Sequence, residues 1–328
     1  MKKVSLELGS GGQMMRGFIT EYILANFQNP FLKELSDAAY LPQNITFTTD
    51  SYVVDPIFFP GGDIGTLSVN GTVNDLVVSG SVPKYLSLSL ILEEGLSWES
   101  LEKILFSVKK ASEEAKVKVI TGDTKVVRQG QGDKIYINTA GIGEIIGRPA
   151  VEKVRPGDKL VVTGTLGEHS LAVMLARGDF GLEAEVVSDC APLNFLLPFW
   201  NKGTLWMRDI TRGGLATVLY ELVEKLPFAL VINEQEIPLS PAVKGATELL
   251  GIDPLYLACE GRAVCLVKQE SASDFTKEMR LHRLGSRAAL IGEVSSDEGR
   301  PGELLLRTAS GGLRLLEPLT SELLPRIC

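Results

Sequence analysis

The last residue of the chain is a cysteine, Cys328, whose thiol is a nucleophile at the tip of an arm. The arm contains Pro318 and Pro325, and because proline extends neither a helix nor a central strand, we expect a stiff, extended approach. Chain ends are loosely held unless another element docks them. A terminal cysteine is more often incidental, and the adjacent α-carboxylate disfavours the thiolate. The rest of the chain must therefore show whether this thiol takes part in chemistry.

Four aspartates stand among glycine, threonine and asparagine residues at predicted strand ends and helix starts. They are Asp50, Asp75, Asp123 and Asp209. Mg²⁺ prefers hard oxygen ligands and often shares its shell with substrate phosphates, so carboxylates at turns suit it. Each aspartate alone is more often a turn or cap residue. The four together favour a magnesium site.

Two glycine-rich stretches, Gly9–Gly12 and Gly213–Gly214, each precede a predicted helix, where backbone N–H groups attract phosphate. Neither has P-loop or Rossmann spacing, and a flexible turn is the alternative. Lys125 follows Asp123 by two residues and could neutralise phosphate charge, although most lysines are merely solvated. Glu260 lies in an apolar context that could raise its pKa and make it a general base, with an ordinary turn residue as the alternative.

Composition bounds the class of protein. Apolar residues make up 45% and charged residues 23% of 328 residues, which is typical of a soluble globular protein of two domains. A net charge of −8 argues against broad nucleic-acid binding. We expect no signal peptide and no membrane span, because no long apolar run occurs. Cys190, Cys259 and Cys265 are predicted reduced core residues, and His169 and His282 have no metal-like neighbours, so zinc is not expected. The predicted location is the cytoplasm.

Hydrophobic periodicity predicts the elements of the first half. An amphipathic helix over 98–116 should point Leu101, Ile104, Leu105 and Val108 inward. Residues 117–120 should form a strand that leads into a turn containing Asp123. The other predictions are helices over 15–27 and 72–81, strands over 45–50 and 85–92, a possible continuation at Val53–Val54, a loop over 60–65, and two strand pieces within 135–146.

The second half mixes strands and helices without strict alternation, which favours α+β layers over a doubly wound sheet. We predict domains over residues 1–148 and 149–316, followed by a mobile tail, 317–328. The predicted strands are 159–163, 228–232, 263–268, 289–294, 304–307 and 313–316, and the predicted helices are 167–176, 192–200, 214–225 and 241–251.

Seven motifs occur along the chain in a recognisable order. They are Gly-Ser-Gly-Gly, Phe-Thr-Thr-Asp-Ser-Tyr-Val-Val, Phe-Pro-Gly-Gly-Asp-Ile-Gly, Val-Asn-Gly-Thr-Val-Asn-Asp-Leu, Thr-Gly-Asp-Thr-Lys-Val-Val, Arg-Asp-Ile-Thr-Arg-Gly-Gly and Pro-Arg-Ile-Cys. In this order they resemble the HypE family of [NiFe]-hydrogenase maturation proteins. That family is part of the superfamily of aminoimidazole ribonucleotide synthetase, selenophosphate synthetase and thiamine-monophosphate kinase. The resemblance covers nearly the whole chain, and the ordered set is specific although no single motif is.

The resemblance implies a two-domain α/β fold with ATP and Mg²⁺ held between the domains. It implies a homodimer in which the N-terminal domains pair through their sheets into a barrel. It also implies a reaction: the carbamoyltransferase HypF places a carbamoyl group on Cys328, ATP phosphorylates the carboxamide oxygen, and loss of phosphate and a proton leaves a thiocyanate. The cyano group then passes to iron on the HypC–HypD complex.

The matching motifs also assign residues. Cys328 would carry the group, Glu260 would be the base, and Lys125 would lie near the reacting atoms. The implied metal ligands are Asp50, Asp75, Asp123 and Asp209. The implied nucleotide contacts are Gly11, Gly12, Asp50, Asp63, Asn70, Asp75, Asp123, Thr211, Arg212 and Gly213.

The chain departs from the family pattern at Cys259, where relatives have Asn, at Val77–Val78, and at Leu8. These departures concern the fine geometry of the site. Two other functions stay open at this point. A small-molecule kinase or synthetase of the same superfamily would need no terminal thiol, and a nucleotide-gated scaffold for maturation partners would produce no ADP.

Overall fold

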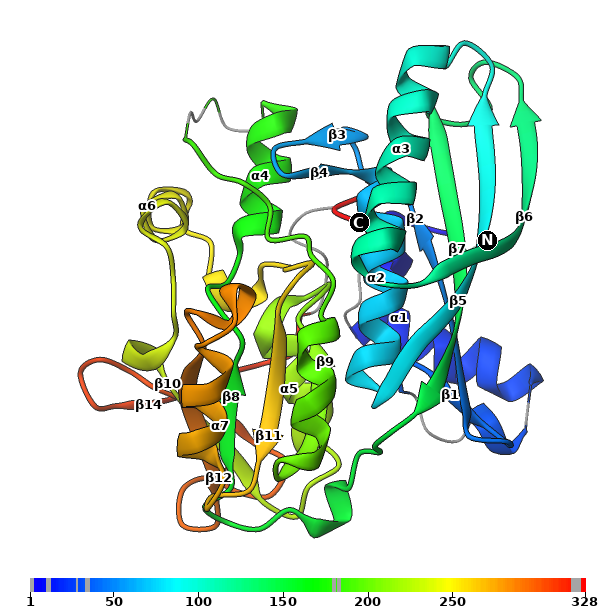
Figure 1. The fold of residues 1–328 in the computed structure, drawn as a ribbon. Helices are drawn as coiled ribbons and strands as arrows, with labels where there is room; N and C mark the ends of the chain where they lie inside the picture. The colour runs from blue at the N-terminus through cyan, green and yellow to red at the C-terminus, as the bar shows by residue number, and fades with distance from the viewer. Residues whose placement is uncertain are drawn as a thin grey trace.

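The computed structural model describes residues 3–9, 13–27, 29–32, 36–178, 181, 184–319 and 326–328. Two β-sheets lie on either side of a central helix, α2 (Ile64–Val78), and the chain terminus lies beside that helix (Figure 1). The expected mixture of strands and helices in two layered domains is confirmed. Among the described residues no helix is both long and apolar enough to cross a bilayer.

The first sheet has five strands, and its parallel pair is joined by helix α3 (Trp98–Glu114). A parallel pair needs such a crossover, because the chain must return to the same end of the sheet. The other neighbouring strands pair antiparallel. In order across the sheet the strands are β1 (Ala39–Leu41), β2 (Ile45–Tyr52), β7 (Ile135–Ile145), β5 (Ser81–Glu93) and β6 (Lys118–Val127).

Helix α2 is buried on all sides, with thirteen of its fifteen residues inaccessible. It begins after the hairpin of β3 (Phe58–Phe59) and β4 (Gly62–Asp63), where the Asp63 carboxylate accepts a hydrogen bond from the Thr66 N–H at 2.8 Å. The predicted helix over 72–81 and the loop over 60–65 were therefore wrong in their bounds. A helix buried all round has no amphipathic pattern. Glycine occupies position 71 inside this helix because a Cβ there would lie 2.2 Å from the Tyr52 hydroxyl.

The second sheet has seven strands, of which β10 (Ala229–Asn233) and β13 (Leu304–Arg307) pair parallel and the other neighbours antiparallel. Its order is β14 (Leu313–Leu315), β13, β10, β12 (Ala289–Ser295), β8 (Lys159–Val162), β11 (Ala263–Val267) and β9 (Thr204–Asp209). The helices of this half are α4 (Glu168–Arg177), α5 (Gly214–Val223), α6 (Pro241–Leu250) and α7 (Ala272–Met279), with a 3₁₀ segment over Asn194–Asn201.

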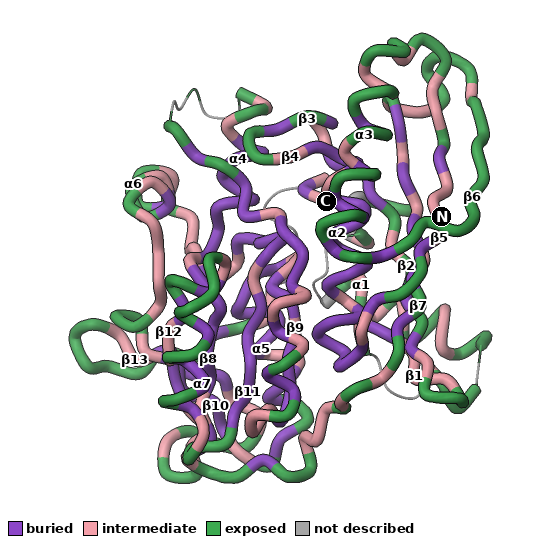
Figure 2. Tube along the Cα trace, in the orientation of Figure 1, coloured by how far each residue is buried: buried purple, intermediate pink, exposed green. Residues whose placement is uncertain are grey.

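The second sheet has a hydrophobic cluster on each face, because successive residues of a strand point to opposite faces. Leu160 and Val162 of β8 pack in a cluster with α5, whereas Val161 packs in a cluster that includes Val73 and Val77 of α2. The contact between the two halves is therefore a continuous hydrophobic core (Figure 2). Because this core is close-packed, it fixes the position of α2 against the second sheet.

Three predicted elements differ in detail. Strand β6 continues through Asp123 and Lys125, so the expected turn there is absent and that prediction was wrong. Leu105 is 40% exposed rather than inward, because the buried face of α3 is formed by Ile104, Val108, Ala111 and Ser112. Residues 135–145 form one strand rather than two pieces. Its glycines let α2 pack closely against it, because a Cβ at Gly141 would lie 2.8 Å from Thr72.

Candidate active site

Three carboxylates converge beside α2. Ligand oxygens of Asp37, Asp75 and Asp209 lie within 4.8 Å of one another. Asp37 precedes β1, Asp75 lies in the last turn of α2, and Asp209 ends β9. The Arg208 guanidinium pairs with Asp37 at 2.8 Å, and the Thr48 hydroxyl donates to Asp75 at 2.8 Å.

The electrostatics of this carboxylate cluster favour a cation. Burial raises the pKa of Asp75 well above its usual value, and the charges of Asp50 and Asp209 raise it further. Burial, with the charge of Asp37 beside it, raises the pKa of Asp209 to about 8. Buried like charges repel one another and so retain protons. Three carboxylate oxygens this close together fit Mg²⁺, which would displace the protons and relieve the repulsion.

Of the four aspartates named from the sequence, Asp75 and Asp209 belong to this cluster and Asp37 was missed. Asp37 stands in Leu-Ser-Asp-Ala-Ala directly before a strand, a turn position of the same kind as the others. The three-residue strand that follows it is too short to show a period, so nothing in the sequence marked the turn. Asp50 is half-buried at the end of β2, and the Tyr52 hydroxyl donates to its carboxylate at 3.3 Å.

A small pocket next to the cluster gathers residues from distant parts of the chain. Glu260 and Cys328 are among them, as are Thr211 and Arg212 from the turn after β9. The Arg212 guanidinium donates to the Gly9 carbonyl at 2.7 Å, which brings the start of the N-terminal glycine-rich stretch beside the site. Gly11 and Gly12 lie outside the described residues. The full lining is Asp50, Ser51, Tyr52, Gly71, Asp75, Asp209, Thr211, Arg212, Glu260 and Cys328.

Glu260 is a buried carboxyl in this pocket, 3% exposed. Its Oε1 accepts no hydrogen bond from any described residue. Burial raises its pKa well above the usual value, and the charges of Asp209 and Asp189 add to this, while Arg212 opposes it. The raised pKa agrees with the expectation from its apolar sequence context. A carboxyl whose pKa is raised toward neutrality is suited to proton transfer.

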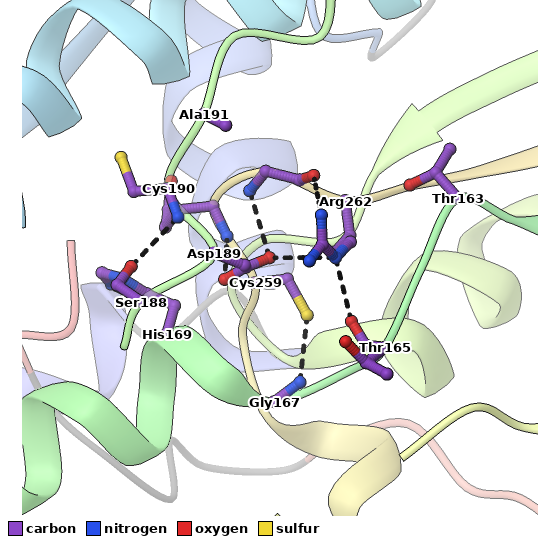
Figure 3. Close-up of polar contacts among 12 residues, drawn as sticks. Thr163, Thr165, Gly167, His169, Ser188, Asp189, Cys190, Ala191, Cys259 and Arg262 are labelled. Carbon is purple, nitrogen blue, oxygen red and sulfur yellow. Dashed lines mark hydrogen bonds and ion pairs between the residues drawn. The ribbon is translucent and has the colours of Figure 1, made fainter. Parts of the chain in front are cut away.

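The turn that carries Glu260 is held by Asp189, which the sequence did not point to. The Asp189 side chain is 1% exposed and accepts the backbone N–H groups of Glu260 and Gly261, each at 3.3 Å, beside Arg262 at 3.7 Å (Figure 3). Gly261 allows this approach, because a Cβ there would lie 1.9 Å from the Asp189 carbonyl. Cys259 is buried next to this turn, with its sulfur accepting the Gly167 N–H at 3.2 Å. All four cysteines are thiols, and Cys190 is half-buried rather than in the core.

The last three residues lie antiparallel to residues 53–55, close to α2 (Figure 1). The Val53 N–H donates to the Cys328 carbonyl at 3.1 Å, and the Asp55 N–H donates to the Arg326 carbonyl at 3.3 Å. The Arg326 side chain donates back to the Val53 carbonyl at 2.9 Å and pairs with Asp133. Strand β2 thus ends at Tyr52, and Val53–Val54 contacts the tail instead of continuing the strand. These contacts place Cys328 in the pocket of Glu260.

Asp63 and Asn70 do not line the pocket of Glu260 and Cys328. Both line a second pocket of about 540 Å³ that also contains Lys110 and Arg262. Asp63 caps α2, and Asp75 is the twelfth residue after it, which puts the two roughly 18 Å apart at 1.5 Å per residue. The Asn70 amide donates to the Cys190 sulfur at 3.5 Å, and its Oδ1 accepts no hydrogen bond among the described residues. Gly213 has a φ of 79° and precedes α5.

Asp123 and Lys125 lie on exposed strand β6 and pair with each other at 2.8 Å. Asp50 is level with Thr139, Leu88 and Gly122 across the sheet. Three strand spacings therefore separate β2 from β6 at this level, roughly 14 Å. Within one chain the structure does not bring these two residues to the carboxylate cluster.

Comparison with known proteins places the fold in a class. Residues 35–145 match the family described as AIR synthase related protein, N-terminal domain, and residues 155–302 match the corresponding C-terminal domain. The chain is thus an AIR synthase-related protein with both domains of that class. A thiamine monophosphate kinase from Aquifex aeolicus shares the fold at 21% identity, with a TM-score of 0.65 over 88% of this chain and 94% of its own.

More similar relatives narrow the class. Carbamoyl dehydratase HypE of Rhodobacter capsulatus is 43% identical over all of this chain and 98% of its own length, and that of Escherichia coli (strain K12) is 41% identical over all of both. The chain belongs to the HypE family. A crystal structure of HypE in complex with ATP has a TM-score of 0.82 at 43% identity, covering 99% of this chain and 100% of its own. HypE in a HypE–HypF complex has a TM-score of 0.87 at 40% identity, covering 92% and 99%.

Proposed function

We propose that this chain dehydrates a carboxamide carried on its own Cys328 to a thiocyanate, with ATP, and so supplies the cyanide ligand for [NiFe]-hydrogenase maturation. The observation that carries the proposal is the position of Cys328 in one pocket with Glu260, Asp75 and Asp209. A tethered group held beside its reaction partners reacts as if intramolecularly. The names of the relatives, carbamoyl dehydratases at 41–43% identity over the full chain, support the same activity.

The reaction divides into two steps. The carboxamide oxygen attacks the γ-phosphate of ATP, which releases ADP, and the nitrogen loses its first proton to solvent, so that a poor leaving group becomes the phosphate ester of an imidate. Glu260 then removes the remaining N–H proton while the C–O bond breaks, so that phosphate leaves and the carbon–nitrogen triple bond forms. Lys125 stabilises the charge on the transferred phosphoryl group. Glu260 can hold the proton because burial raises its pKa.

Asp37, Asp75 and Asp209, with Asp50 beside them, would hold Mg²⁺. When bound there the ion would neutralise charge on the triphosphate. The protein's part is to keep three carboxylates close together despite their repulsion. Arg208 orients one of them, Asp37, through its ion pair.

Asp123 and Lys125 join the site through a second copy of the chain. Strand β6 is exposed on nearly its whole length, with Ile120 58% and Val126 67% exposed. An edge strand with apolar side chains on its surface is a template for pairing. The N-terminal sheets of two subunits therefore pair in a homodimer. HypF is the carbamoyl donor, the HypC–HypD complex is the cyanide acceptor, and the reaction takes place in the cytoplasm.

The test is to incubate the protein with ATP, Mg²⁺, carbamoyl phosphate and HypF, and to follow Cys328 by peptide mass spectrometry. The residue should gain a carbamoyl group and then lose water, with ADP formed in proportion. No mass change at Cys328 would reject the assignment. A small-molecule kinase would keep its ATP turnover in Cys328→Ser, and a scaffold would form no ADP in either protein.

A further inference from the structure

His169 is a buried histidine that the proposed reaction does not use. It lies in the first turn of α4 and is 0% exposed. Its Nε2 lies 2.8 Å from the carbonyl oxygen of Ile327, the residue before Cys328. Its Nδ1 lies 2.8 Å from the Ser188 hydroxyl (Figure 3). Both ring nitrogens are therefore engaged, one of them by the chain terminus.

The chemistry of the partners fixes the direction of these hydrogen bonds. A carbonyl oxygen only accepts, so Nε2 carries the hydrogen and donates to Ile327. Nδ1 then accepts from the Ser188 hydroxyl, whose oxygen in turn accepts the Cys190 N–H at 3.1 Å. Burial lowers the pKa of His169, with Asp189 opposing and Arg177 adding to the effect. The ring is thus neutral, in the one tautomer that can hold the tail.

A second side chain of the same helix contacts the preceding carbonyl of the tail. Arg177, at the end of α4, donates to the carbonyls of Arg326 and Asp55. The second domain thus donates hydrogen bonds to the carbonyls of Ile327 and Arg326. Residues 53–55 of the first domain donate backbone N–H groups to the tail. Ile327 itself is 3% exposed and packs with Tyr52 and Leu171 in one cluster. The tail end is therefore held between the two domains.

We propose that His169, oriented by Ser188, is a positioning residue that holds the tail in the reactive position and aims the group on Cys328 at Glu260. This inference rests on the proposed function for its role in the reaction. Releasing the hydrogen bond at Ile327 would weaken the docking of the tail and so expose the thiol more often to the carbamoyl donor and the cyanide acceptor. A residue with this role controls the dehydration step and the accessibility of the thiol, and leaves carbamoyl transfer intact.

The first test measures the accessibility of the thiol. The rate of Cys328 alkylation by iodoacetamide is followed by peptide mapping, with a peptide that contains no cysteine as the internal reference. In His169→Leu we expect Cys328 to react about tenfold faster, the factor that corresponds to one lost hydrogen bond of about 1.4 kcal/mol. His169→Gln keeps an amide donor at the place of Nε2 and should stay within about twofold of the wild type. His282→Leu is the matched control, since His282 is exposed and stacks on Phe195.

The second test separates positioning from a general structural effect. In a single turnover, His169→Leu should dehydrate carbamoylated Cys328 about tenfold more slowly, while HypF carbamoylates it at least as fast as the wild type. A purely structural defect would slow both steps, and His169→Gln would then not restore dehydration.

The outcome that overturns the proposal is a folded His169→Leu whose Cys328 is alkylated at the wild-type rate. If His169→Leu does not fold, Ser188→Ala is the variant that tests the proposal, because it removes the hydroxyl that orients the ring at Nδ1. Faster alkylation of Cys328 in Ser188→Ala would support the proposal, and an unchanged rate would overturn it. Alkylation needs neither ATP nor partner proteins, so a failure of the proposed reaction in the wild type is distinguishable from a failure of the positioning role.

Discussion

Aspartates of this chain occupy two opposite environments. On β6, Asp123 is exposed, and hydrogen bonds from Lys125 and the Thr124 backbone hold its pKa below the usual value. Beside α2, burial raises the pKa of both Asp75 and Asp209, and a neighbouring carboxylate raises it further, chiefly Asp50 for Asp75 and Asp37 for Asp209. The Asp123 carboxylate on the surface is satisfied by its own neighbours, whereas the buried carboxylates repel one another, which is the property that suits the proposed Mg²⁺ site. A ligand site is recognised by charge that the protein leaves uncompensated, rather than by the presence of carboxylates.

The largest effect should come from Glu260, whose Oε1 accepts no hydrogen bond within the described part of the chain. Glu260→Gln keeps the shape but cannot remove a proton, so we expect dehydration of carbamoylated Cys328 to fall by about 10²- to 10⁴-fold. Single-turnover mass spectrometry measures this rate. Carbamoylation by HypF should continue unchanged, and Glu270→Gln on the exposed turn before α7 is the control. Dehydration at the wild-type rate would remove Glu260 as the base.

Asp75→Asn tests the carboxylate cluster itself. The variant keeps the helix and removes one ligand charge, so we expect ATP hydrolysis to fall by about 10²-fold or more. Release of ADP in the presence of Mg²⁺ is the measurement, with circular dichroism to show that the fold is intact. Retained turnover would exclude Asp75 from the metal site.

Variants of Lys125, which pairs with Asp123 on β6, test whether this lysine acts in the cleft of a partner subunit or in its own chain. If Lys125 serves the cleft of a partner subunit, Lys125→Ala should reduce dehydration by about 10²-fold. Mixed dimers of Lys125→Ala and Glu260→Gln should then regain activity, because one cleft receives both wild-type groups. We expect this recovery after co-refolding the two variants. Mixtures that stay inactive would show that Lys125 acts within its own chain or not at all.

The smallest effect concerns stability and pH. The pKa of Asp209 is about 8 in the folded state against 3.8 as the usual value, so the folded state binds more protons between these limits. Stability therefore falls as pH rises from about 4 to 8. Without Mg²⁺ at pH 8, Asp209→Asn should melt roughly 2–4 °C higher, the shift that about 1 kcal/mol produces. Adding Mg²⁺ should raise the melting temperature of the wild type but not of the variant, measured by calorimetry in EDTA and in Mg²⁺. Equal melting temperatures would contradict a buried repulsion at Asp209.

Sequence reasoning reached much of this site because its motifs are local. Glu260 and Cys328 stand in short, recognisable stretches, and most strands and helices of the second half follow their periodicity. Helix α2 was misplaced because burial on all sides removes the amphipathic signal, and β6 was cut short because Thr-Gly-Asp-Thr has the composition of a turn. Asp37 and His169 were missed for another reason. Their partners, Asp209 and Ile327, are more than 150 residues away, and only the folded chain brings them together.

The docked tail has a consequence for kinetics. The reacting group is attached to the enzyme, so its local concentration is set by the length and docked position of residues 326–328. It does not depend on the concentration of a substrate in solution. Each molecule can then process one group and must be unloaded before it accepts another. Throughput will scale with encounters with the donor and the acceptor, and no saturation curve for a small-molecule carboxamide should exist.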